Sequence, residues 1–348
     1  MLKKKYHGLG LFSGGLDSIL ALKLIQRQGL NILGIHFYSP FFGAPEKIDY
    51  WEKLYGLELL GVDISKEYLS MLLGNVKHGL GKVLNPCVDC KILMLKKVKK
   101  MLSMYGASFI VSGEVLGQRP MSQRRDTLFL ILKEAGVSDI LLRPLTALNL
   151  PSTRVEDLGL VDRQKLLGIK GRGRKAQLEL ARQLGLEEIP SPAGGCLLTD
   201  PEMGKRYLML ISKISSPLSI DFLLCKVGRQ FWWGNKWLII GRNKEDNESL
   251  IKLSSSEDII LKIKDFPGPL GLARKGTNWS KEDLTLAASF LLVFAPKVRQ
   301  SGHTEFGVLF LREKESTEVC AGLKNRKDFF WKEPEWDEKK KKLLLRSV

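Results

Sequence analysis

Two groups of residues in this chain have types and spacings that could do chemistry. The first is the segment Phe12–Ser18, which reads FSGGLDS and lies between an apolar run and a helix-patterned run. Its two glycines let the backbone turn sharply and bring N–H groups close to an anion, and the start of a helix adds partial positive charge. Ser13 and Ser18 add hydroxyl donors. The segment therefore predicts a phosphate-binding turn, and it differs from the phosphate loop in which a lysine follows the glycines.

The second group consists of cysteines. The chain has five, and an odd number argues against a disulfide framework. Cys87 and Cys90 form a CxxC pair, and Cys196 lies in a segment rich in proline and glycine. Three thiolates are one fewer than a structural zinc site uses. Cys225 and Cys320 lie in apolar, strand-like runs, where we expect small buried hydrophobic side chains.

The elements that must position these residues follow an alternating pattern. From residue 8 to about residue 150, short β-like runs alternate with helix-like runs, which predicts an α/β fold with a parallel sheet and helices on both faces. Ligands of such sheets bind beyond the carboxyl ends of the strands, where the FSGGLDS turn would lie. The expected strands are 8–12, 32–37, 57–64, 108–111 and 140–145, and the expected helices are 19–28, 47–55, 66–73, 91–105 and 127–135.

We expect four segments along the chain. Residues 1–150 form the nucleotide-binding domain, and residues 151–215 form an appended basic segment that carries the third cysteine. A second domain of α+β type covers residues 216–331 and starts with β-rich runs at 222–233 and 237–241, joined by a Gly-Asn turn. Residues 332–348 form a basic tail.

The charge of the chain indicates its class of partner. A net charge of +17 and an isoelectric point near 9.6 favour a polyanion, with nucleic acid as the leading candidate. Lysine-rich runs also occur on ordinary solvated helix faces, so charge alone leaves that alternative open. No apolar run approaches the roughly 20 residues that span a bilayer, and no signal-peptide pattern follows the N-terminal lysines. We therefore expect a cytoplasmic protein without a membrane partner.

The FSGGLDS turn resembles the PP-loop of ATP pyrophosphatases, which cleave ATP between the α and β phosphates and adenylate a substrate. The resemblance implies a fold like that of the adenine nucleotide alpha hydrolases, with ATP and Mg²⁺ as cofactors. It also implies a catalytic role for Asp17 in organising the metal or the loop. The nucleotide-binding residues expected on this basis are Phe12, Ser13, Gly14, Gly15, Asp17, Ser18, His36, Phe37, Gly113 and Gln118.

Further motifs narrow the resemblance. The run CVDCK from Cys87, the run VSGEVLGQ from Val111, and the pair Ser122-Gln123 are together similar to the core of tRNA 4-thiouridine synthases. The separated Cys87 and Cys196 resemble those of tRNA 2-thiouridylases. The resemblance covers roughly residues 8–200 and implies a tRNA sulfurtransferase that replaces a uridine oxygen with sulfur, using Cys87 and Cys196 in catalysis. Its partners would be tRNA and a sulfur donor, either sulfide or a cysteine desulfurase. The resemblance does not say which tRNA and which position are modified, or whether the product is a 2-thio or a 4-thio nucleoside. It also leaves open whether the protein is a monomer or a homodimer.

The three cysteines leave more than one sulfur chemistry open. Cys87, Cys90 and Cys196 could hold a [4Fe-4S] cluster with one iron lacking a protein ligand, as cluster-dependent tRNA thiolases resembling this chain are thought to do. The competing hypothesis is persulfide chemistry, in which one cysteine carries sulfur and another resolves it as a disulfide. A purely structural CxxC is the third alternative. We favour the cluster because three thiols exceed what a two-thiol cycle needs.

The C-terminal part carries its own resemblance. The run GRNKEDNESL from Gly241 and a later FPGP are similar to the RNA-binding domain of NFACT proteins, which implies that Arg242, Asn243 and Asn247 contact RNA. We expect this domain to take the place of the RNA-binding domain that precedes the catalytic domain in 4-thiouridine synthases. Two other functions remain open. One is an adenylating enzyme of the amidotransferase or deazaguanine-forming type that acts on a small molecule, and the other is a non-catalytic RNA-binding quality-control protein.

Overall fold

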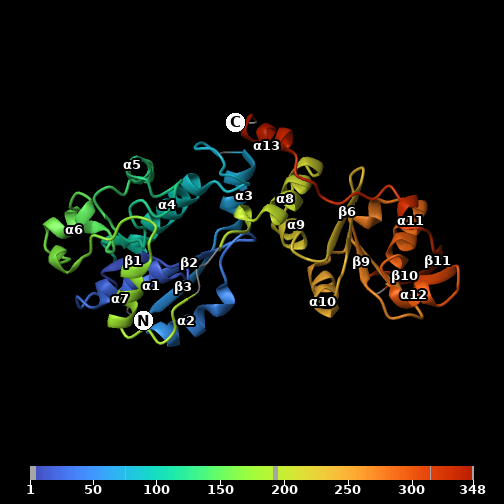
Figure 1. Cartoon of the computed structure of the whole chain (residues 1–348), viewed down its shortest axis with the longest axis horizontal. Coiled ribbons are helices and arrows are strands. Elements are labelled where there is room, and N and C mark those ends of the chain that lie inside the picture. The colour runs from blue at the N-terminus through green and yellow to red at the C-terminus, as the bar shows by residue number, and fades with distance from the viewer. Residues whose placement is uncertain (1–4, 75, 191–194, 314, 347–348) are drawn as a thin grey trace. The chain divides into compact units, whose positions relative to one another are not determined.

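The computed structural model describes residues 5–74, 76–190, 195–313 and 315–346. The chain divides into two compact units (Figure 1). The first unit contains the chain up to Asp200 together with its C-terminal end from Leu343, and the second unit is Pro201–Lys342. Within the described ranges, no helix is both long enough and apolar enough to cross a membrane.

The first unit is built on a five-stranded sheet in the order β3-β2-β1-β4-β5, in which every pair of strands is parallel. Central β1 is buried along its whole length because it pairs with β2 on one side and β4 on the other. This arrangement confirms the predicted parallel sheet. The strands are β1 (Gly8–Leu11), β2 (Ile32–Tyr38), β3 (Glu58–Asp63), β4 (Phe109–Val111) and β5 (Leu141–Leu142).

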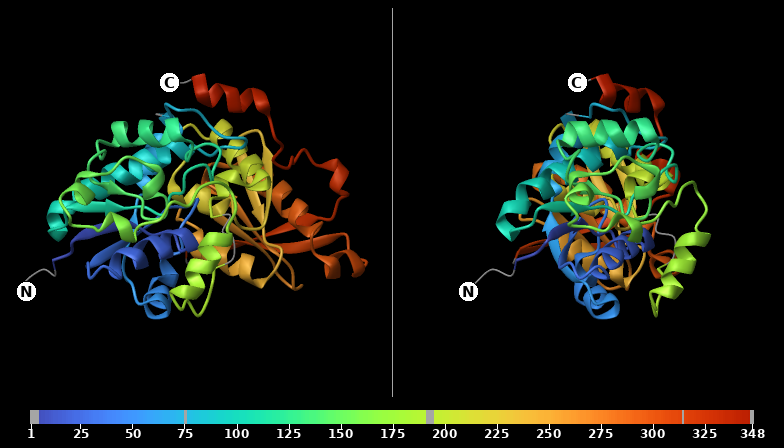
Figure 2. Two further views of the ribbon diagram at one scale, coloured as in Figure 1. Left: turned by 60° about the vertical axis from the view of Figure 1, so that its left-hand side comes forward. Right: turned by 90° about the vertical axis from the view of Figure 1, so that its left-hand side faces the viewer.

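Helices cover both faces of this sheet. The strand order reverses at β1, so right-handed crossovers place the helices before and after the reversal on opposite faces. Figures 1 and 2 show α4 and α5 on one side of the sheet and α1 on the other. The helices of this unit are α1 (Leu16–Gln26), α2 (Ile48–Tyr55), α3 (Ser65–Gly74), α4 (Cys87–Tyr105), α5 (Arg125–Ala135), α6 (Arg154–Asp157) and α7 (Lys175–Gln183).

Several element boundaries differ from the prediction by a few residues, and those of α4 and β5 affect the site. Helix α4 begins at Cys87 instead of after Cys90, so the CxxC pair lies on its first turn. Pro86 precedes this turn, where its missing N–H costs no helical hydrogen bond. Strand β5 has only two residues because the chain leaves the sheet at Arg143, and Pro144 has no N–H to continue the ladder.

The second unit contains a six-stranded antiparallel sheet in the order β11-β10-β8-β9-β7-β6, which confirms the predicted α+β domain. The apolar side chains of the sheet and of α11 share one core that includes Phe231, Phe290 and Leu291. Its strands are β6 (Arg229–Trp233), β7 (Lys236–Ile240), β8 (Ile259–Ile263), β9 (Leu270–Arg274), β10 (Glu305–Arg312) and β11 (Glu315–Gly322), and its helices include α8 (Pro201–Lys213), α9 (Ser219–Leu224), α10 (Lys244–Leu253), α11 (Lys281–Leu292) and α12 (Pro296–Gln300). A further helix, α13 (Glu338–Arg346), lies at the C-terminal end of the chain.

The first β-rich run expected in this domain was placed too early. Residues 219–224 form helix α9, and strand β6 begins only at Arg229. Gly228 lies between α9 and β6. Its φ is 61°, and a Cβ at this position would be only 2.4 Å from the carbonyl oxygen of Ile240. The predicted turn is confirmed at Gly234, which has φ of 59° between β6 and β7.

A buried arginine ties together three elements of the second unit. Arg274 Nε donates to Asp221 over 2.8 Å, and its Nη1 donates to Asp258 over 2.8 Å. Both carboxylates are buried. The guanidinium therefore supplies the positive charge that two desolvated carboxylates need.

Candidate active site

The FSGGLDS turn joins β1 to α1 and is closed by hydrogen bonds around Ser18. Ser18 Oγ donates to the carbonyl of Gly15 over 2.7 Å and accepts from the N–H of Ser13 over 3.2 Å. The N–H of Phe12 donates to the carbonyl of Ile35 over 2.9 Å, which extends the pairing of β1 with β2 up to the turn. Because the first N–H groups of α1 have no acceptor within the helix, this turn offers donors and partial positive charge to an anion.

Gly14 is a position where only glycine fits. Its φ is 75°, and a Cβ would lie 2.6 Å from Cζ2 of Trp51. The Trp51 ring also packs edge-on against Phe12 and His36, at centroid distances of 5.4 and 5.0 Å. Trp51 was not predicted as a site residue, since a single tryptophan in a helical run gives no signal in the sequence.

Gly113 lies against the first turn of α1. A Cβ at Gly113 would be 2.5 Å from the carbonyl carbon and oxygen of Asp17 and 2.7 Å from the backbone nitrogen of Ser18. Only a residue without a side chain permits this approach. The end of β4 and the nucleotide turn therefore meet, as the order of the strands requires.

The Asp17 side chain is partly buried among polar and charged groups. Burial raises the pKa of its carboxyl, while the amide of Gln118 and the positive charge of Arg174 oppose this rise. Gln177 and Arg119 act in the same direction as Gln118 and Arg174, with smaller effects. Within the described part of the chain, no group donates a hydrogen bond to Asp17 Oδ1. An unpartnered buried oxygen suits a cation or a donor from a ligand, and the role of Asp17 in organising Mg²⁺ stays a prediction.

His36 and Phe37 are both buried in β2. Nδ1 of His36 is 3.1 Å from the carbonyl oxygen of Phe12, and its Nε2 accepts from the N–H of Ala44 over 2.9 Å. Burial lowers the pKa of His36, so the neutral ring with a proton on Nδ1 satisfies both contacts. His36 thus anchors the start of the turn, and the expectation that it lines an adenine site stays a prediction.

The three cysteines of the first unit come close together. Cys87 and Cys90 are three residues apart on the first turn of α4. The N–H of Leu197 donates to the carbonyl of Phe41 over 2.8 Å, and the carbonyl of Leu198 accepts from Leu84, which fixes the segment after Cys196. Residues 191–194 of the predicted Pro/Gly-rich segment lie outside the described residues.

Each of these thiols affects the ionisation of another. Burial raises the pKa of Cys90 to about 12, and negative charge on Cys196 and Cys87 adds to the rise. Burial likewise raises the pKa of Cys196 to about 11, with a further contribution from Cys87. The sulfur atoms therefore lie within electrostatic range of one another.

Two side chains contact the sulfur atoms of the CxxC pair. Asn85 Nδ2 donates to Sγ of Cys87 over 3.1 Å. Tyr68 is buried in α3, and its hydroxyl makes a hydrogen bond with Cys90. Asn85 lies in the quoted NPC sequence, whereas Tyr68 is 22 positions before Cys90 and had no signal that could have found it.

Thiolates are ligands both of single metal ions such as zinc and of iron-sulfur clusters. Among the described residues, no three histidine, cysteine, aspartate or glutamate side chains are grouped so that they could hold a metal ion. In a [4Fe-4S] cluster each thiolate binds a different iron, so the ligands stand farther apart than around one ion. That Cys87, Cys90 and Cys196 hold such a cluster stays a prediction.

Arg119 connects the nucleotide turn with the cysteines. Its positive charge favours the ionised forms of both Asp17 and Cys196. The charge of one side chain therefore acts on both Asp17 and Cys196, which are more than 170 residues apart in the sequence.

A buried ion network holds α4 against the carboxyl ends of β4 and β5. Glu114 accepts from Arg143 Nε over 3.0 Å and from Ser112 Oγ over 3.1 Å, and Lys91 Nζ lies 3.9 Å from its other oxygen. Burial alone would raise the pKa of Glu114, but Lys91 and Arg143 outweigh it and hold the pKa below the usual value. Since Lys91 follows Cys90, this network fixes the helix turn that carries the two thiols.

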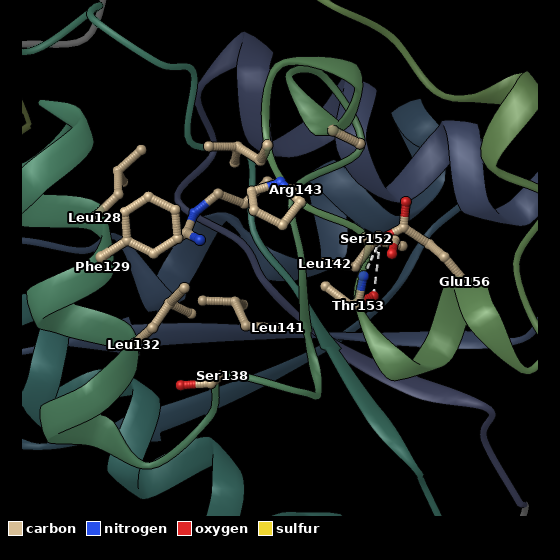
Figure 3. A pocket seen from close by; sticks show the side chains of 13 residues that line it. Leu128, Phe129, Leu132, Ser138, Leu141, Leu142, Arg143, Ser152, Thr153 and Glu156 are labelled. Atoms are coloured by element: carbon tan, nitrogen blue, oxygen red, sulfur yellow. Dashed lines mark hydrogen bonds between the residues drawn. The ribbon is translucent and has the colours of Figure 1, made fainter.

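A surface pocket lies along the outer edge of β5, away from this chemistry. Figure 3 shows it between apolar side chains of α5, such as Phe129, and the Thr153–Glu156 cap of α6. No residue of the FSGGLDS turn and none of the three cysteines lines it. We therefore do not regard it as the reaction site, although pockets are the usual first candidates.

The cysteines outside the site have different environments. Cys225 is buried after α9, which confirms the prediction of a small hydrophobic residue. Cys320 is exposed on β11, so the same prediction was wrong there. It lies on an edge strand whose outward face is open to solvent.

The residues expected to contact RNA in the second unit have roles in the fold. Arg242 forms an ion pair with Asp246 over 2.7 Å, and Asn243 caps α10 by accepting from the N–H of Asp246. Asn247 Oδ1 accepts from the N–H of Leu270 over 3.0 Å. Contacts of these residues with RNA stay a prediction.

A pair of stacked aromatic rings, one of them exposed, lies near the β6–β7 hairpin. Trp232 and Trp237 are buried and stack on each other, with ring centroids 4.9 Å apart. Trp233 instead stacks on Phe330, which is 74% exposed, and Lys236 Nζ lies 4.5 Å from the centroid of the Trp233 ring. Stacked rings beside a cation are suited to nucleic-acid bases and phosphates.

Two protein-family models match separate parts of the chain. Residues 4–151 match the model of the family described as thiamine biosynthesis protein (ThiI). Residues 228–322 match the model described as NFACT protein RNA binding domain. Both resemblances inferred from the motifs are thereby confirmed.

Individual relatives match part of the chain. The chain is 28% identical over 145 residues to a probable tRNA sulfurtransferase of Thermococcus kodakarensis, covering 40% of this chain and 37% of the relative. It is 32% identical over 165 residues to a probable tRNA sulfurtransferase of Methanobrevibacter smithii, covering 45% and 42%. The chain thus spans about two fifths of the length of these relatives. A solved structure, the U34-tRNA thiolase NcsA from Methanococcus maripaludis with its [4Fe-4S] cluster, is 20% identical, with 56% of this chain and 62% of that chain covered and a TM-score of 0.30.

Proposed function

We propose that the chain is an ATP-dependent tRNA sulfurtransferase, which adenylates a uridine carbonyl oxygen and replaces that oxygen with sulfur. The observation that carries the proposal is that two consecutive residues at the end of β4 meet the two halves of the site. Gly113 lies against Asp17 of the nucleotide turn, and Glu114 pairs with Lys91, the residue after Cys90. An adenylating site and a sulfur-handling site must share one substrate carbon. Their proximity is therefore a requirement of the reaction.

The FSGGLDS turn would act in the first half of the reaction, the adenylation. Ser13, Ser18 and the first N–H groups of α1 would bind the phosphates of ATP, and Asp17 would hold Mg²⁺ beside them. The uridine carbonyl oxygen attacks the α phosphorus, and the bond to the β phosphate breaks. The donors of the turn stabilise the charge of the departing pyrophosphate, because they are already oriented by the hydrogen bonds around Ser18.

The three cysteine thiols would act in the second half of the reaction, the transfer of sulfur. A sulfur nucleophile adds to the activated carbon, and AMP leaves with the original oxygen. Cys87, Cys90 and Cys196 would hold a [4Fe-4S] cluster, which supplies an iron without a protein ligand where a donated sulfur atom can bind. Asn85 and Tyr68 orient the Cys87 and Cys90 sulfur atoms, and sulfide or a cysteine desulfurase would provide the sulfur.

The second unit would bind the tRNA. Its family match and the stacked pair of Trp233 and exposed Phe330 support this assignment, as does the net charge of +17. Nucleic-acid binding that depends on lysine and arginine weakens with salt, because counterions are released from the phosphates.

The test combines turnover with product analysis. The reduced protein, purified without oxygen, is incubated with ATP, Mg²⁺, sulfide and unmodified tRNA, and pyrophosphate and thiolated nucleosides are measured. Wild type should release pyrophosphate only when tRNA is present and should form thiouridine. Cys196→Ala should lose thiouridine and the iron and sulfide bound to wild type, and Cys320→Ala, which changes an exposed cysteine outside the site, should lose neither.

Other outcomes of this test would indicate one of the alternative functions. Pyrophosphate release that needs a small-molecule acceptor and ignores tRNA would indicate an amidotransferase-like or deazaguanine-forming enzyme. Tight RNA binding without any pyrophosphate release would indicate a non-catalytic RNA-binding protein. Colourless, iron-free wild type that still thiolates tRNA would remove the cluster and favour the persulfide route.

A further inference from the structure

Asp89 lies between the two cysteines of the CxxC pair and is buried in the first turn of α4. Its carboxylate accepts hydrogen bonds from two backbone groups of the loop that precedes the helix. The N–H of Lys77 donates to Oδ1 over 3.1 Å, and the N–H of His78 donates to Oδ2 over 3.0 Å. Asp89 therefore fastens residues 77–78 to the helix turn that carries both thiols.

The ring of His78 joins this carboxylate to a second helix. Nδ1 of His78 is 3.1 Å from Asp89 Oδ1, and Nε2 is 2.9 Å from Oε1 of Glu134, on α5. The His78 side chain is only 18% exposed, so water competes little for these contacts. The ring thus holds the Asp89 carboxylate in place from the side of α5.

The loop that Asp89 fastens, residues 76–86, ends beside the first thiol. Asn85 Nδ2 donates to Sγ of Cys87 over 3.1 Å. The N–H of Gly81 donates to the carbonyl of Asn85 over 2.9 Å, and a Cβ on Gly81 would lie 2.3 Å from Asn85 Nδ2. The loop folds back on itself here, which leaves Asn85 little freedom to move away from the Cys87 sulfur.

The same loop contacts the segment of the third thiol. The N–H of Leu84 donates over 3.1 Å to the carbonyl of Leu198, two residues after Cys196. Leu84 and Leu198 are 1% and 0% exposed, so no water replaces this hydrogen bond if the two segments separate only slightly. A displacement of the loop would therefore change the position of Cys196 relative to Cys87.

We propose that Asp89 and His78 are positioning residues of the sulfur-transfer site, which hold loop 76–86 in place and thereby set the spacing of the Cys87 and Cys196 thiols. The inference deepens the proposed function and rests on its assignment of these thiols to sulfur transfer. Both side chains act through the loop, and neither has to touch tRNA, ATP or the transferred sulfur.

Two substitutions of His78 separate its two contacts. An asparagine amide can take the place of Nδ1 and donate to Asp89, whereas a glutamine amide can take the place of Nε2 and reach only Glu134. His78→Asn should therefore behave as wild type, and His78→Gln should behave as His78→Ala. Asp89→Asn should also fail to hold the loop, because its amide nitrogen cannot accept a backbone N–H.

The first measurement is timed alkylation of the metal-free full chain with iodoacetamide, followed by peptide mass spectrometry. His78→Ala, His78→Gln and Asp89→Asn should react at Cys90 and Cys196 about tenfold faster than wild type. This factor is the effect expected when one hydrogen bond to a charged group no longer keeps the loop closed. His78→Asn should react at the wild-type rate.

Lys99→Met is the matched control. It removes a hydrogen bond of 2.7 Å from α4 to the carbonyl of Gly136, which also joins α4 to the end of α5 but lies further along α4 than the cysteines. The variant should alkylate at the wild-type rate, although it loses a contact between the same two helices.

The second measurement is turnover with tRNA, ATP, Mg²⁺ and sulfide under the anaerobic conditions described above. The kcat of thiolation by His78→Ala should fall at least about tenfold, because displaced thiols no longer present sulfur to the activated carbon. KM for tRNA and the pyrophosphate released in the first turnover should stay within about twofold of wild type, since the nucleotide turn is unchanged.

Three results would overturn the inference. His78→Ala and Asp89→Asn could alkylate at the wild-type rate, and a lower melting temperature without faster alkylation would give both residues a role in the fold alone. His78→Asn could behave as His78→Ala, or Lys99→Met could give the same acceleration. Faster alkylation in the variants, together with a wild-type protein that never thiolates tRNA, would support the positioning of the thiols and contradict the proposed function only.

Discussion

Gly113 lies so close to Asp17 that a Cβ on Gly113 would be 2.5 Å from the Asp17 carbonyl carbon and oxygen. The contact joins the end of β4 to the first turn of α1. It explains why two motifs about 100 residues apart in the sequence belong to one site. Both obstructing groups are backbone, so a side chain at this position cannot be accommodated by a rotamer change.

Gly113→Ala should therefore displace the first turn of α1 from the end of β4. We expect a loss of about 1–3 kcal/mol in the free energy of unfolding, as for other overpacked sites, together with weaker ATP binding. Urea unfolding and calorimetric titration with ATP measure the two effects. Gly74→Ala is the matched control, because a Cβ there meets nothing within 4 Å. Equal behaviour of the two variants would mean that the close approach is absent in solution.

The raised thiol pKa values predict slow alkylation of the metal-free protein. The thiolate is the reactive form, and the pKa of Cys90 is about 12 and that of Cys196 about 11 in the folded chain, against about 9 when unfolded. At pH 9, both should react with iodoacetamide more than about tenfold slower than in the urea-unfolded chain. Peptide mass spectrometry after timed quenching gives the rates.

The same values fix the direction of a pH effect on stability. The folded state retains the thiol protons, so this contribution is fully present below pH 9 and is lost as the pH rises towards 12. The difference in alkylation rate between folded and unfolded chain should disappear over the same interval. Folded-state rates that match the unfolded chain at pH 9 would contradict the burial of these thiols.

Arg274→Met should strongly destabilise the second unit. The substitution leaves the buried carboxylates of Asp221 and Asp258 without a counter-charge. Removing one partner of a buried ion network lowers the free energy of unfolding by about 3–5 kcal/mol. Urea unfolding followed by tryptophan fluorescence reports on this unit, where most of the tryptophans lie.

A matched surface variant tests whether burial is the cause. Lys264→Met breaks an exposed ion pair with Glu318 and should cost no more than about 1 kcal/mol. If both variants lost the same amount, charge removal in general, and not the burial of the Arg274 network, would account for the effect.

Phe330→Ala should weaken RNA binding through lost stacking. Removal of an exposed aromatic that stacks on a base costs about 1–3 kcal/mol. Because stacking releases no counterions, the slope of log affinity against log salt should stay as in wild type. Fluorescence anisotropy with labelled tRNA over a series of KCl concentrations gives both quantities.

Ile251→Ala provides the comparison for this prediction. Ile251 is an exposed apolar residue on α10 of the same unit, at 57% exposure. Its loss should leave RNA affinity unchanged. Equal losses in both variants would point to a general apolar effect and remove the aromatic pair from the RNA surface.

Local residue patterns predicted the parallel sheet, the FSGGLDS turn and the second domain well. Strand and helix periodicities are set by residues close in the sequence, and a turn such as Ser13–Ser18 is closed by its own hydrogen bonds. The errors occurred at ends of elements, as at α4 and α9, where a few neighbouring contacts decide whether a residue joins a helix.

The amino-acid sequence by itself determined which residues could do chemistry: the glycines and hydroxyls of one turn, and three thiols in two separate segments. Only the tertiary structure decided which of them meet. The order of the strands places Gly113 against Asp17, and long-range hydrogen bonds of Leu197 and Leu198 bring Cys196 towards α4. In the structure Gln177 also lies beside Asp17, and both ring nitrogens of His36 take part in hydrogen bonds. Such contacts depend on how distant segments pack, and no local pattern records that packing.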